Sequence, residues 1–232
     1  MSLITHCLSM LAPANCQLCG EPLVQGEEYI CAMCASEILP VEYHHYSVVD
    51  NPLRRRLPRT APIANIATLT HYTHQCVAAR LIRHGKYDNR PQLIAYLSQL
   101  LSAHLFAQGV LQDVDMLIPV PMYWWKRLRR GYNQAQIIAQ VLHRDYGIAL
   151  NTKVLRATRG HSSQTRQSAE GRTANLRNSF ELVRPEAISN RHIAIVDDIL
   201  TTGSTLSEVI NTLLPAEPRA ITIITLAATP PC

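Results

Sequence analysis

Two adjacent carboxylates, Asp197 and Asp198, follow the apolar run 193–196 and precede a turn that is rich in hydroxyl groups. Within that turn, Gly203 lets the backbone approach a ligand closely. The N–H groups of the turn, and of the helix predicted to start after it, are free to bind a phosphate. Four side chains add hydroxyl donors: Thr201, Thr202, Ser204 and Thr205. The segment therefore has the chemistry of a phosphate-binding loop.

The paired carboxylates suit a second group on the same ligand, because carboxylates accept hydrogen bonds from vicinal sugar hydroxyls. A ribose 5-phosphate explains both features, and it makes Asp197 and Asp198 the candidate catalytic residues. The alternative is a strand–turn–helix in which Ser204 or Thr205 merely caps the helix. That alternative does not explain the paired acids. A Walker-type loop fits less well, because its lysine is missing.

A basic and aromatic segment follows the apolar stretch 116–120, and we predict that it is a loop. It contains Trp124, Trp125, Lys126, Arg127, Arg129 and Arg130. A run of cations is by default solvated, but the position after a predicted strand favours an anionic ligand. Aromatic faces beside cations also suit single-stranded nucleic acid, whereas the alternative is a tryptophan buried in the domain. A second set of cations lies outside the predicted site and adds candidate DNA contacts: Arg54, Arg55 and Arg56.

Two Cys-x-x-Cys pairs near the N-terminus are separated by eleven residues: Cys16 with Cys19, and Cys31 with Cys34. Each pair presents two thiolates, and two pairs complete a tetrahedral site, so we predict a closed, structural zinc site. In so small a module the metal would supply most of the folding energy. The alternatives are four free buried cysteines, or a redox pair, which requires a thioredoxin-like fold.

Strands that alternate with helices must position these residues. Apolar periodicity predicts strands at 66–69, 116–120, 193–196 and 220–228, and helices at 77–84, 91–107, 133–146 and 204–214. This alternation implies an α/β fold with a parallel sheet, in which ligands bind beyond the carboxyl ends of the strands. Both candidate clusters follow such ends, so we expect one site. We interpret three further residues as ordinary strand and helix-start residues: His71, His74 and Cys76.

The chain of 232 residues divides into three parts by composition. We predict a zinc-ribbon-like module at 1–45, an extended, basic, proline-containing linker at 46–62, and an α/β domain at 63–232. The apolar content of 47% and charged content of 17% exclude collagen-like and disordered classes. A net charge of +5 permits a phosphorylated ligand or nucleic acid. The sequence shows no export signal or membrane helix, so we expect a cytoplasmic protein without membrane insertion.

The stretch 196–205, Val-Asp-Asp-Ile-Leu-Thr-Thr-Gly-Ser-Thr, closely resembles the phosphoribosyl-pyrophosphate signature of type I phosphoribosyltransferases. Further motifs are similar to the ComF/GntX family: Ile-Pro-Val-Pro at 118–121, Arg-Gly-Tyr-Asn-Gln-Ala at 130–135, and Gln164, Arg172, Asn175 and Phe180. With the N-terminal cysteines, the resemblance spans most of the chain, although several members carry additional cysteine pairs. It implies a type I phosphoribosyltransferase fold joined to a small zinc-ribbon-like module.

The resemblance also implies roles for particular residues. Asp197 and Asp198 would hold the ribose hydroxyls, and residues 201–205 would hold the 5-phosphate of phosphoribosyl pyrophosphate. The pyrophosphate loop would use Mg²⁺ and the cations Lys126, Arg127, Arg129 and Arg130 to stabilise the leaving charge. The polar segment 159–172 resembles the flexible loop that covers such sites; Arg166 and Arg172 belong to it, and Arg166 could reach the pyrophosphate. Plain surface disorder is the alternative for that segment.

Members of this family are associated with natural competence, the uptake and processing of transforming DNA. The sequence therefore predicts a ComF-type protein that binds phosphoribosyl pyrophosphate with Mg²⁺ and, if catalytic, displaces pyrophosphate from C1 of the ribose. The implied partners are single-stranded DNA and competence helicase or uptake proteins. Two alternatives are a non-enzymatic DNA-handling factor that retains the fold, and a nucleotide-salvage phosphoribosyltransferase, which would not need the zinc module.

Overall fold

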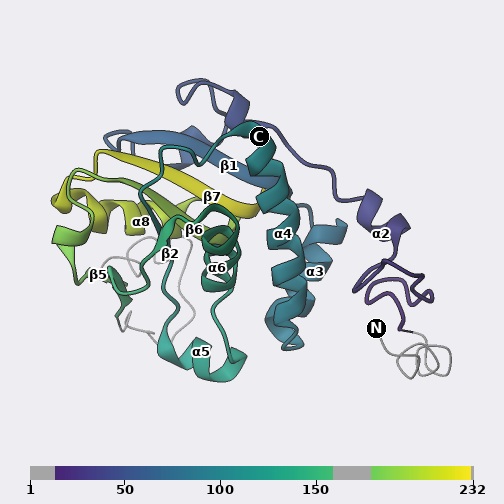
Figure 1. The fold of residues 1–232 in the computed structure, drawn as a ribbon. Helices are drawn as coiled ribbons and strands as arrows, with labels where there is room; N and C mark the ends of the chain where they lie inside the picture. Colours follow the sequence, from purple (N-terminus) through teal and green to yellow (C-terminus); the bar gives the residue numbers. More distant parts are fainter. Residues whose placement is uncertain (1–13, 159–178, 231–232) are drawn as a thin grey trace, which may run out of the picture.

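The computed structural model describes residues 14–158 and 179–230, and Figure 1 shows how its elements are arranged. Its centre is a five-stranded sheet in the order β1-β7-β6-β2-β3. The strands are β1 (Ile63–His71), β2 (Met116–Pro119), β3 (Ala149–Leu150), β6 (His192–Leu200) and β7 (Ala220–Ala228). All neighbouring strands pair in parallel, which confirms the α/β fold with a parallel sheet.

Helices cover both faces of the sheet (Figure 1). One face carries α3 (Val77–Tyr87), α4 (Pro91–Gln108) and α6 (Gln134–Tyr146), and the other carries α8 (Ser204–Leu213). The alternation of side chains along each strand divides the core in the same way. In β6, Ala194 and Val196 belong to the cluster of the three helices, whereas Ile193 and Ile195 belong to the cluster of α8. These four helices confirm the helices predicted from apolar periodicity.

Two elements differ from the expectation. The strand predicted at 193–196 continues through both carboxylates to Leu200, because β6 pairs with β7 as far as Ala228. The segment predicted as a basic loop contains a helix, α5 (Trp124–Arg130), so the loop prediction is wrong. Leucine, lysine and arginine favour helix, and Gly131 ends α5 in the left-handed region, with φ of 82°.

Smaller elements complete the described part of the chain. Short helices are α2 (Ala32–Ser36), η1 (Tyr43–His45), η2 (Arg54–Arg56), η3 (Pro185–Ala187) and η4 (Leu214–Ala216). Strands β4 (Leu155–Ala157) and β5 (Phe180–Leu182) form an antiparallel pair. No helix within these ranges is both long and apolar enough to span a membrane.

The cysteine-containing segment contacts the α/β domain directly. Cys16 is buried in the same apolar cluster as Leu81 of α3 and Leu97 of α4. Tyr29 packs edge-on against Tyr96 of α4, with 6.1 Å between the ring centroids. A change in this segment can therefore reach α3 and α4 through packed side chains.

Residues 46–62, expected to be extended, are folded onto the sheet. Leu53 is fully buried and Leu57 is 4% exposed, and both belong to the cluster that includes Ile66 of β1. The two leucines flank η2, so one short turn of helix directs both into the core. Burial of these apolar side chains stabilises the folded conformation of a segment whose prolines and arginines indicated a linker. The proposed boundaries of the three parts stay a prediction.

Of the three residues interpreted as strand and helix-start residues, His71 and Cys76 match that interpretation. His71 is the last residue of β1. Cys76 caps α3, because its Sγ accepts a hydrogen bond of 3.3 Å from the N–H of Ala79. His74 lies in the turn between these two elements.

His44 is a buried imidazole whose two ring nitrogens have no hydrogen-bond partner among the described residues. Its side chain is 8% exposed, and its ring lies edge-on to His45 and to His104. Burial, with a smaller contribution from these two neighbours, lowers the pKa of His44 to about 4. The neutral imidazole is therefore the form that the folded protein favours.

This burial makes the protein sensitive to acid. The unfolded chain takes up the His44 proton below pH 6.5, whereas the folded protein does so only near pH 4. The contribution of neutral His44 to the free energy of unfolding is thus fully present above pH 6.5. The free energy of unfolding should fall by about 1–3 kcal/mol as the pH falls from 6.5 towards 4. Urea unfolding at pH 7.5 and pH 5.0 measures this, and His44→Leu should reduce the pH dependence. The exposed His143→Gln is the control. Equal pH dependence in His44→Leu and wild type would contradict the assignment.

Candidate functional site

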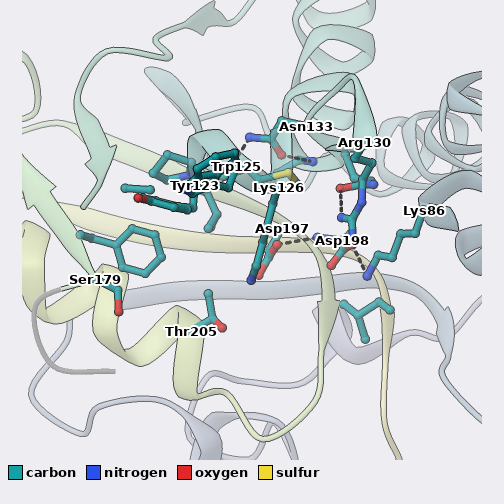
Figure 2. Close-up of a pocket in the computed structure, with 18 of the residues that line it drawn as sticks. Lys86, Tyr123, Trp125, Lys126, Arg130, Asn133, Ser179, Asp197, Asp198 and Thr205 are labelled. Atoms are coloured by element: carbon teal, nitrogen blue, oxygen red, sulfur yellow. Dashed lines mark hydrogen bonds and ion pairs between the residues drawn. The ribbon is translucent and has the colours of Figure 1, made fainter. Parts of the chain in front are cut away.

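A pocket of about 1400 Å³ opens at the carboxyl ends of β2 and β6 (Figure 2). Both sequence clusters line it, through Asp197, Asp198, Thr201 and Thr205 of the first and Lys126 and Arg130 of the second. The parallel topology explains this meeting, because it brings the carboxyl ends of neighbouring strands to one edge of the sheet.

Several predicted residues do not line this pocket, namely Thr202, Gly203, Ser204, Arg127 and Arg129. Helix α5 explains the division among the cations. Lys126 and Arg130 are four residues apart on one face of the helix and both line the pocket, whereas Arg127 and Arg129 are exposed and do not line it. The flexible-loop residues Arg166 and Arg172 lie outside the described residues, as do Gln164 and Asn175.

The acid pair is mostly shielded from solvent and has a lysine beside it. Lys86 of α3 forms an ion pair with Asp198, and the two side chains are 18% and 16% exposed. The N–H of Asp198 donates a hydrogen bond of 2.9 Å to the carboxylate of Asp197. Burial, followed by the charge of Asp198, raises the pKa of Asp197 to about 7. A carboxyl group that titrates near neutral pH is typical of sites that bind or move protons.

Arg56 packs against the turn that follows β6 and holds its backbone in place. Gly203 has φ of 81°, and a Cβ atom there would overlap the carbonyl oxygen of Arg56, so the position requires glycine. The guanidinium of Arg56 donates a hydrogen bond of 2.8 Å to the carbonyl oxygen of Thr229. The hydroxyl of Thr229 in turn donates a hydrogen bond of 3.4 Å to the carbonyl oxygen of Thr201. These contacts hold the backbone of the turn in place.

Neither Ser204 nor Thr205 caps the helix, although the hydroxyl of Thr202 accepts a hydrogen bond of 3.4 Å from the N–H of Ser204. Gly203 is the N-cap of α8, and no side chain caps that helix. The hydroxyl of Thr202 lies 2.9 Å from that of Ser204, and Thr205 lines the pocket. The alternative in which Ser204 or Thr205 merely caps α8 is therefore wrong, and a ligand anion can approach the start of the helix.

The sequence did not single out several residues that line the pocket: Lys86, Tyr87, Tyr123 and Ser179. Lysine near the end of an amphipathic helix is ordinarily solvated, so no local pattern marks Lys86. Asn133 belongs to the motif at 130–135, but the helix predicted at 133–146 begins one residue later, and Asn133 is its cap. The side chain of Asn133 accepts a hydrogen bond of 3.1 Å from the N–H of Ala135 and donates one of 2.9 Å to the carbonyl oxygen of Val120. These bonds connect the start of α6 to the end of β2.

Helix α5 also presents an aromatic surface to solvent. Trp124 and Trp125 are stacked with 4.0 Å between ring centroids and 21° between ring planes. They are 48% and 57% exposed, so the alternative of a tryptophan buried in the domain is wrong. We call these two residues the tryptophan pair. Four cations follow the pair on the same short helix, and an exposed aromatic surface of this kind often marks a binding site.

The arginines of η2 differ from one another in their contacts. The guanidinium of Arg54 donates to the carbonyl oxygens of Pro58 and Arg59 at 2.9 and 3.0 Å, and that of Arg56 donates to the carbonyl oxygen of Thr229 next to the hydroxyl-rich turn. Arg55 is exposed. None of the three arginines lines the pocket, as expected, but Arg56 contacts the turn at Gly203 and so reaches the site indirectly.

The four cysteines form a second candidate site. Their Sγ atoms all lie within 4.8 Å of one another, with 3.8 Å from Cys16 to Cys34 and 3.6 Å from Cys19 to Cys31. A tetrahedral zinc ion with Zn–S bonds of about 2.3 Å needs sulfur atoms about 3.8 Å apart. None of these cysteines forms a disulfide. The geometry therefore fits a four-thiolate metal ion.

Electrostatics also favours a thiolate in this cluster. Burial alone would raise the pKa of Cys16, but the backbone N–H groups of Cys19 and Cys31 outweigh it and lower that pKa to about 6. Burial raises the pKa of Cys34, so that thiol is held protonated until a cation binds. The thiolate is the form that binds metal.

Comparisons with known proteins find several relatives of this chain. The family described as phosphoribosyl transferase domain matches residues 127–232. The DNA utilization protein YhgH of Escherichia coli K12 is 30% identical over 234 residues, which cover 95% of this chain and 99% of the relative. Competence protein F of Haemophilus influenzae is 30% identical over 88% of this chain and 87% of its own length. A solved Trypanosoma cruzi hypoxanthine phosphoribosyl transferase aligns with a TM-score of only 0.35, at 14% identity over 61% of this chain and 65% of that one.

Proposed function

Because this chain belongs to the ComF family of proteins with a phosphoribosyltransferase-type domain, we propose that its pocket binds phosphoribosyl pyrophosphate with Mg²⁺ and transfers the phosphoribosyl group. One observation carries the proposal. An acid pair, a hydroxyl-rich turn and two cations of α5 line a single pocket. A ribose that bears a phosphate at one end and pyrophosphate at the other is complementary to all three.

Each part of the ligand has a partner in this arrangement. Asp197 and Asp198 would accept hydrogen bonds from the ribose hydroxyls, while Thr205 and the N–H groups at the start of α8 bind the 5-phosphate. Lys126 and Arg130 extend toward the acid pair in Figure 2 and would stabilise the pyrophosphate. The carboxylates also offer the oxygen ligands that suit Mg²⁺, which would neutralise charge on the leaving group.

The reaction would substitute one group for another at C1 of the ribose. A lone pair of the acceptor forms the new bond as the bond from C1 to the pyrophosphate oxygen breaks, and its electrons leave with the pyrophosphate. The protein contributes position and fixed charge. Calorimetric titration of the full chain with phosphoribosyl pyrophosphate, with and without Mg²⁺, tests the proposal. Absence of saturable binding in both titrations would overturn it.

The cysteine cluster would contribute structure. We propose that it holds one zinc ion with four protein ligands, because the sulfur spacing matches that ion. A site with four protein ligands leaves no open position for substrate, so the ion would stabilise the fold and take no part in the transfer.

Single-stranded DNA is a second ligand that a separate observation favours. The tryptophan pair is exposed and stacked, and cations lie on the same short helix. Bases stack on aromatic faces, and arginine and lysine contact phosphates, whatever the base sequence. Two relatives are named for DNA utilization and for competence. We propose that this chain likewise handles single-stranded DNA in natural competence. Its cytoplasmic location and its helicase or uptake partners stay predictions.

Binding to a labelled single strand should depend on the tryptophan pair and on salt. Trp124→Ala should weaken binding by about 1–3 kcal/mol with little sequence preference. Trp124 is chosen because Trp125 lines the pocket. Arg127→Ala and Arg129→Ala should each flatten the salt dependence, because each removes one phosphate contact. Fluorescence anisotropy at several salt concentrations is the measurement. Phe106→Ala, which removes an exposed aromatic on α4, is the control.

Testing the arginines of η2 in the same DNA-binding experiment requires a variant that leaves the pocket intact. Arg55→Ala is the informative variant, because changing Arg56 would disturb the turn behind the pocket. If wild type shows no salt-sensitive binding at low salt, the DNA proposal fails and a small-molecule acceptor is favoured.

A further inference from the structure

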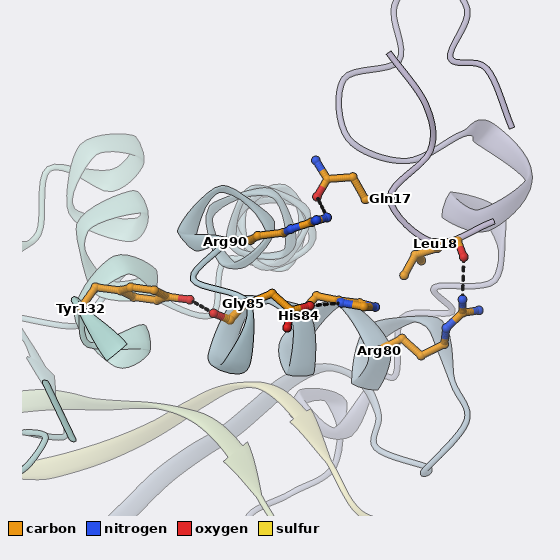
Figure 3. A network of polar contacts seen from close by, with 8 residues as sticks. Gln17, Leu18, Arg80, His84, Gly85, Arg90 and Tyr132 are labelled. Carbon is orange, nitrogen blue, oxygen red and sulfur yellow. Dashed lines mark hydrogen bonds and ion pairs between the residues drawn. The ribbon is translucent and has the colours of Figure 1, made fainter. Parts of the chain in front are cut away.

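The two residues inside the first Cys-x-x-Cys pair both contact the α/β domain (Figure 3). The carbonyl oxygen of Leu18 accepts a hydrogen bond of 2.7 Å from the guanidinium of Arg80 on α3. The side-chain oxygen of Gln17 accepts a hydrogen bond of 3.0 Å from the guanidinium of Arg90, the residue that precedes α4. Because Gln17 and Leu18 lie between two candidate metal ligands, a bound metal ion would fix the backbone that makes these contacts.

Helix α3 leads from this contact to the pocket. Lys86 lies six residues beyond Arg80, about 9 Å along the helix axis, and forms the ion pair with Asp198. Gly85, directly before Lys86, accepts a hydrogen bond from the hydroxyl of Tyr132. Arg80 therefore holds one end of α3, and Tyr132 holds the other end next to the pocket.

Close packing leaves α3 little freedom to shift alone. A Cβ atom at Gly85 would overlap the side chain of Ile94, so α3 and α4 touch without a gap at this point. Leu81 and Ile82 of α3 and Leu97 of α4 are fully buried in the cluster that includes Cys16. Packed elements of this kind move as units, so a displacement at the cysteines reaches Lys86.

We infer that Arg80 and Arg90 are positioning residues that couple the cysteine cluster to the pocket through Lys86. Metal at the cysteines holds α3 in the register that sets Lys86 against Asp198. Loss of the metal would then lower the affinity of the pocket although the metal touches no part of the ligand. The identity of that ligand rests on the proposed function, whereas the coupling itself does not.

Hydrogen exchange tests the coupling without any ligand. Arg80→Ala should retain one metal ion per chain, yet the amides of α3 near Lys86 should exchange about 3- to 30-fold faster. Removing the metal from wild type with a chelator should have the same effect, and should add little in Arg80→Ala. The matched control is Arg83→Ala on the same helix, whose guanidinium donates to the carbonyl of His74 outside this network. Unchanged exchange in Arg80→Ala would overturn the coupling.

A double-mutant cycle then tests the route through Lys86. Arg80→Ala should lower the affinity for phosphoribosyl pyrophosphate about 3- to 30-fold, and should cause no further loss when combined with Lys86→Ala. Arg80→Lys should recover most of the affinity, because lysine can donate to the carbonyl of Leu18. Additive losses would overturn the route. Absence of binding by wild type would overturn the proposed function, while the exchange result still decides the coupling.

Discussion

The purified protein is expected to contain about one zinc ion per chain, and Cys16→Ser is expected to lose it. Serine replaces a thiolate with a hydroxyl, which is a poor ligand for zinc at neutral pH. The remaining three sulfur atoms, spaced for a tetrahedron, leave the ion with an incomplete coordination sphere. Because a structural zinc site contributes folding free energy directly, the affected segment should lose protection from proteolysis.

Elemental analysis of protein prepared without chelators measures the first effect, and limited proteolysis measures the second. Cys76→Ser is the matched control, because Cys76 is a free cysteine that caps α3 and serine is a favourable cap. This control should keep both its metal and its resistance to protease. Wild type without zinc, or Cys16→Ser with a full complement of zinc, would contradict the assignment.

The parts of the site that are local in sequence could be predicted. The segment 193–205 contains a buried strand, the acid pair and the hydroxyl-rich turn in one continuous stretch, so its pattern is visible without a structure. The cysteine pairs are equally local, and the structure brings their sulfur atoms together as the spacing predicts. Alternating apolar elements predicted the parallel sheet that places both clusters at one edge.

The parts that depend on tertiary contacts could not be predicted. Lys86 meets Asp198 only because α3 lies across the sheet, and Arg56 supports Gly203 only because Leu53 and Leu57 are buried. Neither residue differs in its local pattern from a solvated cation. Helix α5 was missed for another reason. It has seven residues and no buried residue, so it has no apolar periodicity to detect.

Replacing Asp197 and Asp198 together by asparagine should weaken the binding of phosphoribosyl pyrophosphate by at least about 100-fold. Each carboxylate would make charge-assisted hydrogen bonds to a ribose hydroxyl, worth about 1.5–3 kcal/mol per contact. Asparagine preserves the shape and removes the charge, so the loss reports electrostatics rather than a cavity. The exposed Asp113→Asn is the control, since it lies before β2 at the opposite edge of the sheet. Unchanged affinity in the folded double variant, measured by calorimetry, would contradict the site assignment.

The raised pKa of Asp197 adds a pH dependence with a definite sign. Burial and the charge of Asp198 raise this pKa to about 7, so the carboxyl is protonated below pH 7 and charged above it. Because the charged form accepts hydrogen bonds and binds Mg²⁺, affinity should rise between pH 6 and pH 8. The phosphates of the ligand also titrate near pH 6, so Asp197→Asn is the necessary comparison. This single variant should keep only the shallower dependence that the ligand contributes. An equally steep pH dependence in Asp197→Asn would show that Asp197 does not titrate at the binding site.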